Sequence, residues 1–319
     1  MKRHPTMARQ AKEYLLLRRT LGFKMKSQGE MLLQFAKYLD CSGHRGPFTT
    51  EMALRWANLP KNASRGYRAK RLSAVRCFAR YLAVRDGRTE VPDRHLVPRV
   101  CFRLRPHLYS QREIEQLLEA SGRLWPSYPL KWLVYRTLFG LLACTGLRVS
   151  EALRLNAVDV DLEHGVLRIE KTKFKKSRLA PLHPTATRAL RRYAQARYGR
   201  QMVHDDSPFF VGSTGRRLHY DVVCRVFEQL RDMLGWKKGN GELPRPRIHD
   251  LRHTFACRRL LSWYRQGKNV HNLIAALSTY MGHGKVTDTY WYLTGTPELL
   301  AIAGGRFERF ARMGKGGRA

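Results

Sequence analysis

Apolar residues recur at helical spacing along most of this 319-residue chain, and this period constrains its fold more than any other feature. Within Ser64–Val84, for example, Leu72, Val75, Phe78 and Leu82 form a stripe along one helical face. The same reasoning predicts further helices at Ala8–Leu21, Ser27–Leu39, Ser110–Ala120, Lys131–Cys144, Pro184–Tyr198, Asp221–Leu234, Asp250–Tyr264 and Val270–Met281, and a shorter one from Thr49 or Thr50 to Ala57.

The helical spacing of apolar residues is interrupted at Val91–Pro106, where Pro92, Pro98 and Pro106 are separated by basic residues. Proline lacks the backbone N–H that regular structure uses, so we interpret this segment as a linker between domains. The chain is long enough to form two cores. We therefore expect a helical N-terminal domain at residues 1–100 and a second domain at residues 107–319.

Two short runs in the second half have strand character. Gly165–Glu170 and Arg178–Leu182 flank a lysine-rich segment, and this arrangement predicts a β-hairpin. The lysines of the segment are Lys171, Lys173, Lys175 and Lys176. The expected fold class is therefore mainly α with a small antiparallel β-sheet (α+β).

Basic residues dominate the charge of the chain. Lysine and arginine total 60 against 25 acidic residues, which gives a formal net charge of +35. A compact protein tolerates such self-repulsion best beside a polyanion, so a nucleic acid is the expected partner. A ribosome-associated protein and a membrane-surface binder are the alternatives. The even spread of basic residues along the chain favours nucleic acid over a membrane.

The predicted helix Ser64–Val84 carries basic residues outside its apolar stripe. A solvated surface explains any single one of them, but several on one helix of so basic a chain favour contacts with DNA phosphates. The candidates are Arg65, Arg68, Lys70, Arg71 and Arg76, and we expect Arg80 on the same outer face.

The six cysteines are widely and irregularly spaced, without a Cys-x-x-Cys pair. This spacing indicates neither a structural zinc site nor a disulfide framework, so we expect reduced, mostly buried thiols in a cytoplasmic protein. The most apolar stretch, Leu130–Leu147, contains Lys131 and Arg136. We expect it to be a buried helix rather than a membrane span.

Residues suited to chemistry lie in separate segments of the second half. The turn Thr145–Glu151 places Arg148 between two helices, from where an arginine points into a cleft more readily than from a helix middle. A purely structural ion pair with Glu151 is the alternative explanation of Arg148. The hairpin lysines can contact phosphates, reach into the DNA minor groove or protonate a leaving oxygen.

The segment Ile248–His253 brings His249, Arg252 and His253 onto one helical face. An acid/base group would then lie beside a phosphate-binding arginine. Zinc bound by the two histidines is the alternative. It is disfavoured because Asp250 stands where zinc proteases have a glutamate, and no third ligand is evident.

A last segment, Met281–Leu293, contains His283, Tyr290 and Tyr292. Each of these residues alone would be unremarkable, since a tyrosine in such a segment is usually part of a core. Together and in this order, however, the segments resemble the catalytic domain of the tyrosine recombinases, the phage integrase family. That family has an arginine in a Thr-Gly-Leu-Arg turn, a lysine in a β-hairpin, a His-x-Leu-Arg-His-Thr helix, a Gly-His pair and then a nucleophilic tyrosine.

The resemblance extends from Leu108 to the C-terminus. The N-terminal domain is similar to the family's helical core-binding (SAM-like) DNA-binding domain in type and position only. The resemblance implies an enzyme that cleaves and rejoins double-stranded DNA through a 3′-phosphotyrosyl intermediate, with no metal or other cofactor. The residues that it assigns to catalysis are Arg148, Lys173, His249, Arg252, His283 and Tyr292, with Glu151 and His253 supporting them.

Two of these assignments have an alternative in the sequence. The register of the two flanking strands brings Lys173 to the catalytic position, with Lys171 as the second choice. The distance along the chain from His283 favours Tyr292 as the nucleophile, and we interpret Tyr290 as packing with Trp291.

The resemblance also implies assembly and a biological context. Family members act as tetramers on paired DNA sites, some beside sister recombinases or accessory DNA-bending proteins. A predicted helix at Pro297–Arg312 would dock on a neighbouring subunit or on its own domain. Trp291 and Thr294–Glu298 are like those of integrases from bacterial mobile elements. We therefore expect a nucleoid-associated enzyme of integration, excision or transposition.

Other functions remain open at this stage. A type IB topoisomerase-like enzyme would share the chemistry, and a DNA-binding regulator could have lost catalysis on the same scaffold. The full catalytic set disfavours the regulator. A metal-dependent nuclease lacks support, because the sequence has no evident carboxylate cluster.

Overall fold

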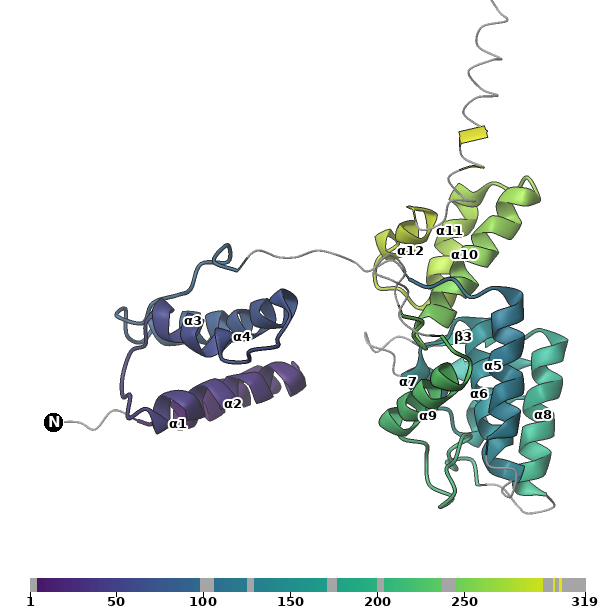
Figure 1. Cartoon of the computed structure of the whole chain (residues 1–319), viewed down its shortest axis with the longest axis horizontal. Helices are drawn as coiled ribbons and strands as arrows, with labels where there is room; N and C mark the ends of the chain where they lie inside the picture. The colour runs from purple at the N-terminus through teal and green to yellow at the C-terminus, as the bar shows by residue number, and fades with distance from the viewer. Residues whose placement is uncertain are drawn as a thin grey trace, which may run out of the picture. The chain divides into compact units, whose positions relative to one another are not determined.

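The computed structural model describes residues 5–97, 106–124, 129–170, 177–199, 204–236, 245–294, 301 and 304–305 (Figure 1). The chain divides into two compact units, Met1–Arg103 and Leu104–Ala319. The segment 171–176 with its four lysines, the residues 98–105 of the expected linker, and most of the expected helix Pro297–Arg312 lie outside the described residues.

The first unit consists of the helices α1 (Met7–Thr20), α2 (Lys26–Cys41), α3 (Thr50–Asn58) and α4 (Arg65–Ala83). A side-chain hydroxyl caps the N-terminus of three of these helices. The hydroxyls of Thr6, Thr49 and Ser64 each accept a hydrogen bond from a backbone N–H of the first turn. Their apolar faces meet in an aromatic core, where the ring of Phe35 lies 5.1 Å from that of Phe48 and 5.2 Å from that of Trp56.

The outer face of α4 differs from the expectation at Arg71. Arg65, Lys70 and Arg80 are exposed, but Arg71 is buried. Its guanidinium donates to the carbonyl of Trp56 (2.7 Å) and lies 3.7 Å from the centre of that indole ring. Helical geometry explains the error, since Arg71 precedes Val75, Phe78 and Leu82 on the same stripe. The expectation that Arg71 lies on the outer face is therefore wrong, and its internal contacts disfavour it as a DNA contact.

Arg76 on the same helix is half-buried and also has partners within the protein. Its guanidinium donates to the carbonyl oxygens of Pro92 (2.7 Å) and Asp93 (2.9 Å). Arg76 therefore holds the segment that follows α4, a role that the sequence did not suggest.

The second unit is built around helix α6 (Pro129–Thr145), which packs against α5 (Gln111–Arg123), α8 (Pro184–Tyr198) and α10 (Asp250–Arg265) (Figure 1). The apolar stretch expected to be a buried helix is α6, with Leu138, Phe139 and Leu142 in the main core. None of the described helices is long and apolar enough to cross a membrane. The remaining helices are α7 (Val149–Ala152), α9 (Tyr220–Met233), α11 (Val270–Met281) and α12 (Thr287–Tyr290), with 3-10 turns η1 (Ala157–Asp159) and η2 (Trp291–Thr294).

The sheet of this unit has three antiparallel strands in the order β1 (Val160–Asp161), β2 (Val166–Ile169) and β3 (Arg178–Pro181). Leu167 pairs with Ala180 and Ile169 with Arg178, so β2 and β3 flank the lysine segment as expected. The predicted fold class, mainly α with a small antiparallel sheet, is confirmed. The short elements β1 and α12 were not predicted.

Candidate active site

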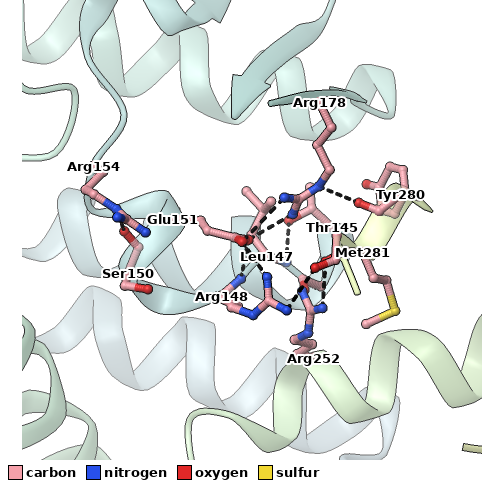
Figure 2. Close-up of polar contacts among 12 residues, drawn as sticks. Thr145, Leu147, Arg148, Ser150, Glu151, Arg154, Arg178, Arg252, Tyr280 and Met281 are labelled. Carbon is pink, nitrogen blue, oxygen red and sulfur yellow. Dashed lines mark hydrogen bonds and ion pairs between the residues drawn. The ribbon is translucent and has the colours of Figure 1, made fainter. Parts of the chain in front are cut away.

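Arg148 lies in the turn between α6 and α7, where the sequence predicts it. Gly146 takes a positive φ of 63° and ends α6, and Arg148 then precedes α7 in an extended conformation. The Glu151 carboxylate accepts both the backbone N–H of Arg148 (3.1 Å) and its Nη1 (2.7 Å). Figure 2 shows these contacts between Arg148 and Glu151. Arg148 Nη2 also donates to the carbonyl of Gly282 at 3.0 Å. Arg148 therefore has the ion pair with Glu151 and also reaches the segment that leads to His283.

Arg252 reaches the same place from α10. Its Nη1 donates to the carbonyl of Gly146 (2.6 Å) and its Nη2 to that of Met281 (2.7 Å), as Figure 2 shows in part. Because Met281 and Gly282 are consecutive, two guanidinium groups meet at the C-terminal end of α11. Burial, together with the charge of Arg148, lowers the pKa of Arg252 to about 10. Two cations so close together form a site for an anion.

Glu151 is a buried carboxylate between two arginines. In addition to Arg148, Arg178 from β3 donates Nη2 to Glu151 at 2.8 Å. Burial alone would raise the pKa of Glu151, but the hydrogen bonds and charge of Arg178 and the contacts of Arg148 lower it to about 2. Sequence reasoning missed Arg178 as a site residue, because 27 positions separate it from Glu151 and no local spacing links them.

The histidines of α10 lie against the tyrosine segment. The ring of His253 is 5.0 Å from that of His249, 5.1 Å from that of Trp291 and 5.4 Å from that of Tyr292. Burial, together with the neighbouring His249, lowers the pKa of His253 to about 3. His249 is exposed, yet the protein around it displaces enough water to lower its pKa, and the charge of Arg252 acts in the same direction. Both pKa shifts favour the neutral form of the imidazole ring.

His283 follows the left-handed Gly282 that ends α11. Its Nδ1 lies 2.7 Å from the hydroxyl of the fully buried Thr289, a partner that no sequence motif indicated. Burial and the charge of Arg252 lower the pKa of His283 to about 4. Its ring is nearly parallel to that of Tyr292, with 5.9 Å between ring centres.

Tyr292 lies in η2 and is only 3% exposed. Its ring packs in a cluster that includes Cys257, Leu260 and Met281. Burial raises the pKa of Tyr292, whereas the charge of Arg252 and a hydrogen bond with it act to lower the pKa. Tyr290, by contrast, is 40% exposed. The structure thus brings Tyr292 together with the two arginines and the histidines that the sequence singled out.

The second unit also matches a known family. Residues 108–298 match the model of the phage integrase family, which is more than half of the chain. The chain belongs to the phage integrase family. Relatives agree with this assignment, since the chain is 41% identical to the putative integrase/recombinase y4rB of Sinorhizobium fredii, over 95% of this chain and 98% of the relative. It is 28% identical to the tyrosine recombinase XerC of Thermodesulfovibrio yellowstonii, over 73% of this chain and 72% of the relative.

Solved integrase structures share the fold. A Tn1549 transposon integrase in complex with a circular-intermediate DNA superposes with a TM-score of 0.70 at 18% identity, covering 95% of this chain and 99% of the other. A lambda integrase dimer bound to a core site gives a TM-score of 0.65 at 17% identity, covering 91% and 77%. As a member of the integrase family, the chain is a tyrosine-type recombinase.

One cysteine lies at the site, since Cys257 packs beside Tyr292 and its Sγ donates to the carbonyl of that residue at 3.8 Å. The cysteines among the described residues form no disulfide, but only Cys257 of them is buried, whereas Cys41, Cys77 and Cys144 are exposed, so the prediction of mostly buried thiols is wrong. Within the part of the chain that the structure describes, no group of three or more His, Cys, Asp or Glu side chains could hold a metal ion.

Proposed function

We propose that this integrase cuts one DNA strand at a time by attack of Tyr292 on a backbone phosphate, leaving a 3′-phosphotyrosyl link and a free 5′-hydroxyl. The observation that carries the proposal is the convergence of Arg148 and Arg252 on the adjacent carbonyls of Gly282 and Met281, next to Tyr292. A phosphodiester needs its negative charge compensated before a nucleophile approaches. Two anchored guanidinium groups supply this compensation.

The arginines keep donors for the phosphate after their internal hydrogen bonds are made. A guanidinium has five N–H donors, and Arg148 and Arg252 each use only part of them on Glu151 and the backbone. Since these anchors fix the planes of both groups, little reorganisation is needed when charge develops on the non-bridging oxygens.

The neutral histidines suit proton transfer from the nucleophile. If Thr289 accepts the Nδ1 proton of His283, Nε2 of that ring carries a lone pair that can accept the phenol proton. The Tyr292 oxygen then bonds to phosphorus while the bond from phosphorus to the 5′ oxygen breaks. We propose that Lys173 donates the proton that the departing 5′ oxygen takes up. Because the covalent link conserves the phosphodiester, the reverse reaction reseals DNA without ATP.

Burial of Tyr292 implies that the tyrosine segment moves. At 3% exposure the phenol is not accessible to a DNA backbone, so we propose that α12 and η2 shift when DNA binds. Both elements are only four residues long, and their side chains pack on α10 and α11, so the shift would break these contacts without unfolding a long helix.

The biological role follows from the relatives and is part of the proposal. A putative integrase at 41% identity, together with a transposon integrase of the same fold, supports integration, excision or transposition of a mobile element. We propose that the protein acts at the bacterial nucleoid as a tetramer on paired DNA sites, beside sister recombinases or DNA-bending proteins where these are needed. Arg65, Arg68 and Lys70 of the N-terminal unit would contact phosphates.

Strand exchange tests this function. Two different duplexes that the protein cleaves, selected from a pool of nicked random-sequence DNA, are mixed with it, and recombinant strands are counted by sequencing. We expect joined strands from both duplexes. Relaxation of supercoiled plasmid without any joined strands would instead indicate a topoisomerase-like enzyme.

A further inference from the structure

We propose that Arg178 is a positioning residue that shares the Glu151 carboxylate with Arg148 and keeps Arg148 aimed at the scissile phosphate. The inference rests on the proposed role of Arg148 in phosphate binding. Arg178 is the first residue of β3 and lies just beyond the lysine segment, so it also ties that hairpin to the phosphate-binding turn.

The contacts of Arg178 join three parts of the site. Its Nε donates to the carbonyl of Tyr280 (2.6 Å) near the end of α11, and its Nη2 and Nη1 donate to Glu151 at 2.8 and 3.4 Å (Figure 2). The Arg178 side chain is only 8% exposed. A buried guanidinium with this many fixed partners holds α7, α11 and β3 in one register.

Arg178 also changes the charge balance around Arg148. Glu151 carries one negative charge and lies between two guanidinium groups, so the triad has a net charge of +1. Without Arg178, the pair of Arg148 and Glu151 would be neutral, and the carboxylate would form an ion pair with Arg148 alone. Arg148 would then have little attraction left for a phosphate.

Gly282 supplies an independent observation. A Cβ at this position would lie 2.6 Å from Nη1 and 2.9 Å from Cζ of Arg178, so the guanidinium passes directly over the Gly282 backbone. The carbonyl of the same residue accepts Nη2 of Arg148. The absent side chain at Gly282 therefore leaves the space for the Arg178 guanidinium beside the residue whose carbonyl accepts Arg148.

The test compares Arg178→Ala and Arg178→Lys with the wild-type protein on nicked duplexes selected by covalent capture on the wild-type protein. Arg168→Ala, which removes an exposed arginine from β2 of the same sheet, is the matched control. Single-turnover cleavage is measured with an ordinary phosphate and with a methylphosphonate at the scissile position. The methylphosphonate diester is uncharged, so its cleavage depends less on the charge of Arg148.

On phosphate DNA we expect Arg178→Ala to slow cleavage on the order of 100-fold and Arg178→Lys about tenfold, since lysine keeps the charge but not the fork of donors. On methylphosphonate DNA the loss in Arg178→Ala should shrink to about threefold. Equal losses on both substrates, or wild-type cleavage of phosphate DNA by Arg178→Ala, would overturn the proposal.

Hydrogen exchange separates this proposal from the reaction itself. The backbone N–H of Arg148 bonds to Glu151, so its exchange should quicken in Arg178→Ala while that of α5 stays unchanged. Faster exchange throughout the second unit would indicate that Arg178 stabilises the whole unit rather than positioning Arg148, and would contradict the proposal. A wild-type protein that forms no adduct on any DNA would contradict the proposed function. In that case the exchange rate of the Arg148 N–H would still show whether Arg178 positions Arg148.

Discussion

The environment of His253 differs strongly from that of a free side chain. It is enclosed by the rings of His249, Trp291 and Tyr292, and its Nδ1 is buried without a hydrogen-bond partner among the described residues. A proton on this ring would have to be accommodated beside the charges of Arg247 and Arg252. The histidine therefore acts as a neutral ring that packs against Tyr292.

Replacing His253 with phenylalanine should change the pH dependence of stability. The folded pKa, about 3, lies below the usual 6.5, so wild-type protein loses stability as the pH falls from 6.5 towards 3. At pH 5 this loss amounts to about 2 kcal/mol, and His253→Phe should not show it. Urea denaturation at pH 8 and pH 5 measures the difference. His271→Phe on α11, which replaces an exposed histidine, is the control, and equal acid sensitivity in wild type and His253→Phe would refute the account.

Single residues also mark the limit of sequence reasoning. Arg148, His249, Arg252, His283 and Tyr292 were found because each lies in a local motif, and the structure brings them together. Arg178 and Thr289 stayed hidden because their roles depend on contacts between distant segments or on a buried turn. Whether Lys173 is the catalytic lysine stays a prediction.

At the scale of elements, the turn between α6 and α7 carries the site. A Cβ at Gly146 would lie 2.5 Å from Cδ1 of Phe255, so α10 packs directly on this turn. The carbonyl of Gly146 also accepts Arg252. Close packing of the turn on α10 is thus a condition for placing Arg252.

Gly146→Ala should therefore destabilise the protein by roughly 3 kcal/mol, from the positive φ and from the clash with Phe255. Gly215→Ala is a matched control, because Gly215 also has a positive φ, 71°, but nothing lies within 4 Å of a Cβ there. We expect that control to cost about 1 kcal/mol. Thermal and urea denaturation measure both, and equal costs would contradict the packing argument.

Element positions were largely predictable, whereas the burial of individual polar residues was not. Helical periodicity identified the long helices, because each has a face that must be buried. Periodicity puts Arg71 on the buried face as well, but we placed it outside because of its charge, whereas its long side chain reaches the indole of Trp56. The strand β1, with two residues, is too short to show any period.

At the scale of the whole molecule, the net charge of +35 makes DNA affinity strongly dependent on salt. Each exposed arginine that contacts a phosphate adds to this dependence, but a buried one does not. Arg65 and Arg71, on the same helix, provide a direct comparison, since Arg65 is exposed and Arg71 is buried.

Arg65→Gln should lower the slope of log affinity against log salt concentration by about 1 on a random duplex. Arg71→Gln should leave the slope unchanged and instead cost on the order of 2 kcal/mol of stability, from its lost contacts with Trp56. Fluorescence anisotropy at several salt concentrations, with denaturation in parallel, makes the measurement. A lower slope in Arg71→Gln alone would contradict the assignment.

The most direct test of the central claim is covalent trapping of the tyrosine. The protein is mixed with a pool of nicked random-sequence duplexes in EDTA, denatured, and assayed for linked DNA, with Tyr292→Phe and Tyr290→Phe alongside. The account predicts an adduct with the wild-type protein and with Tyr290→Phe, and none with Tyr292→Phe. An adduct that persists in Tyr292→Phe would contradict it, and so would the absence of any adduct from wild-type protein that binds the same DNA tightly.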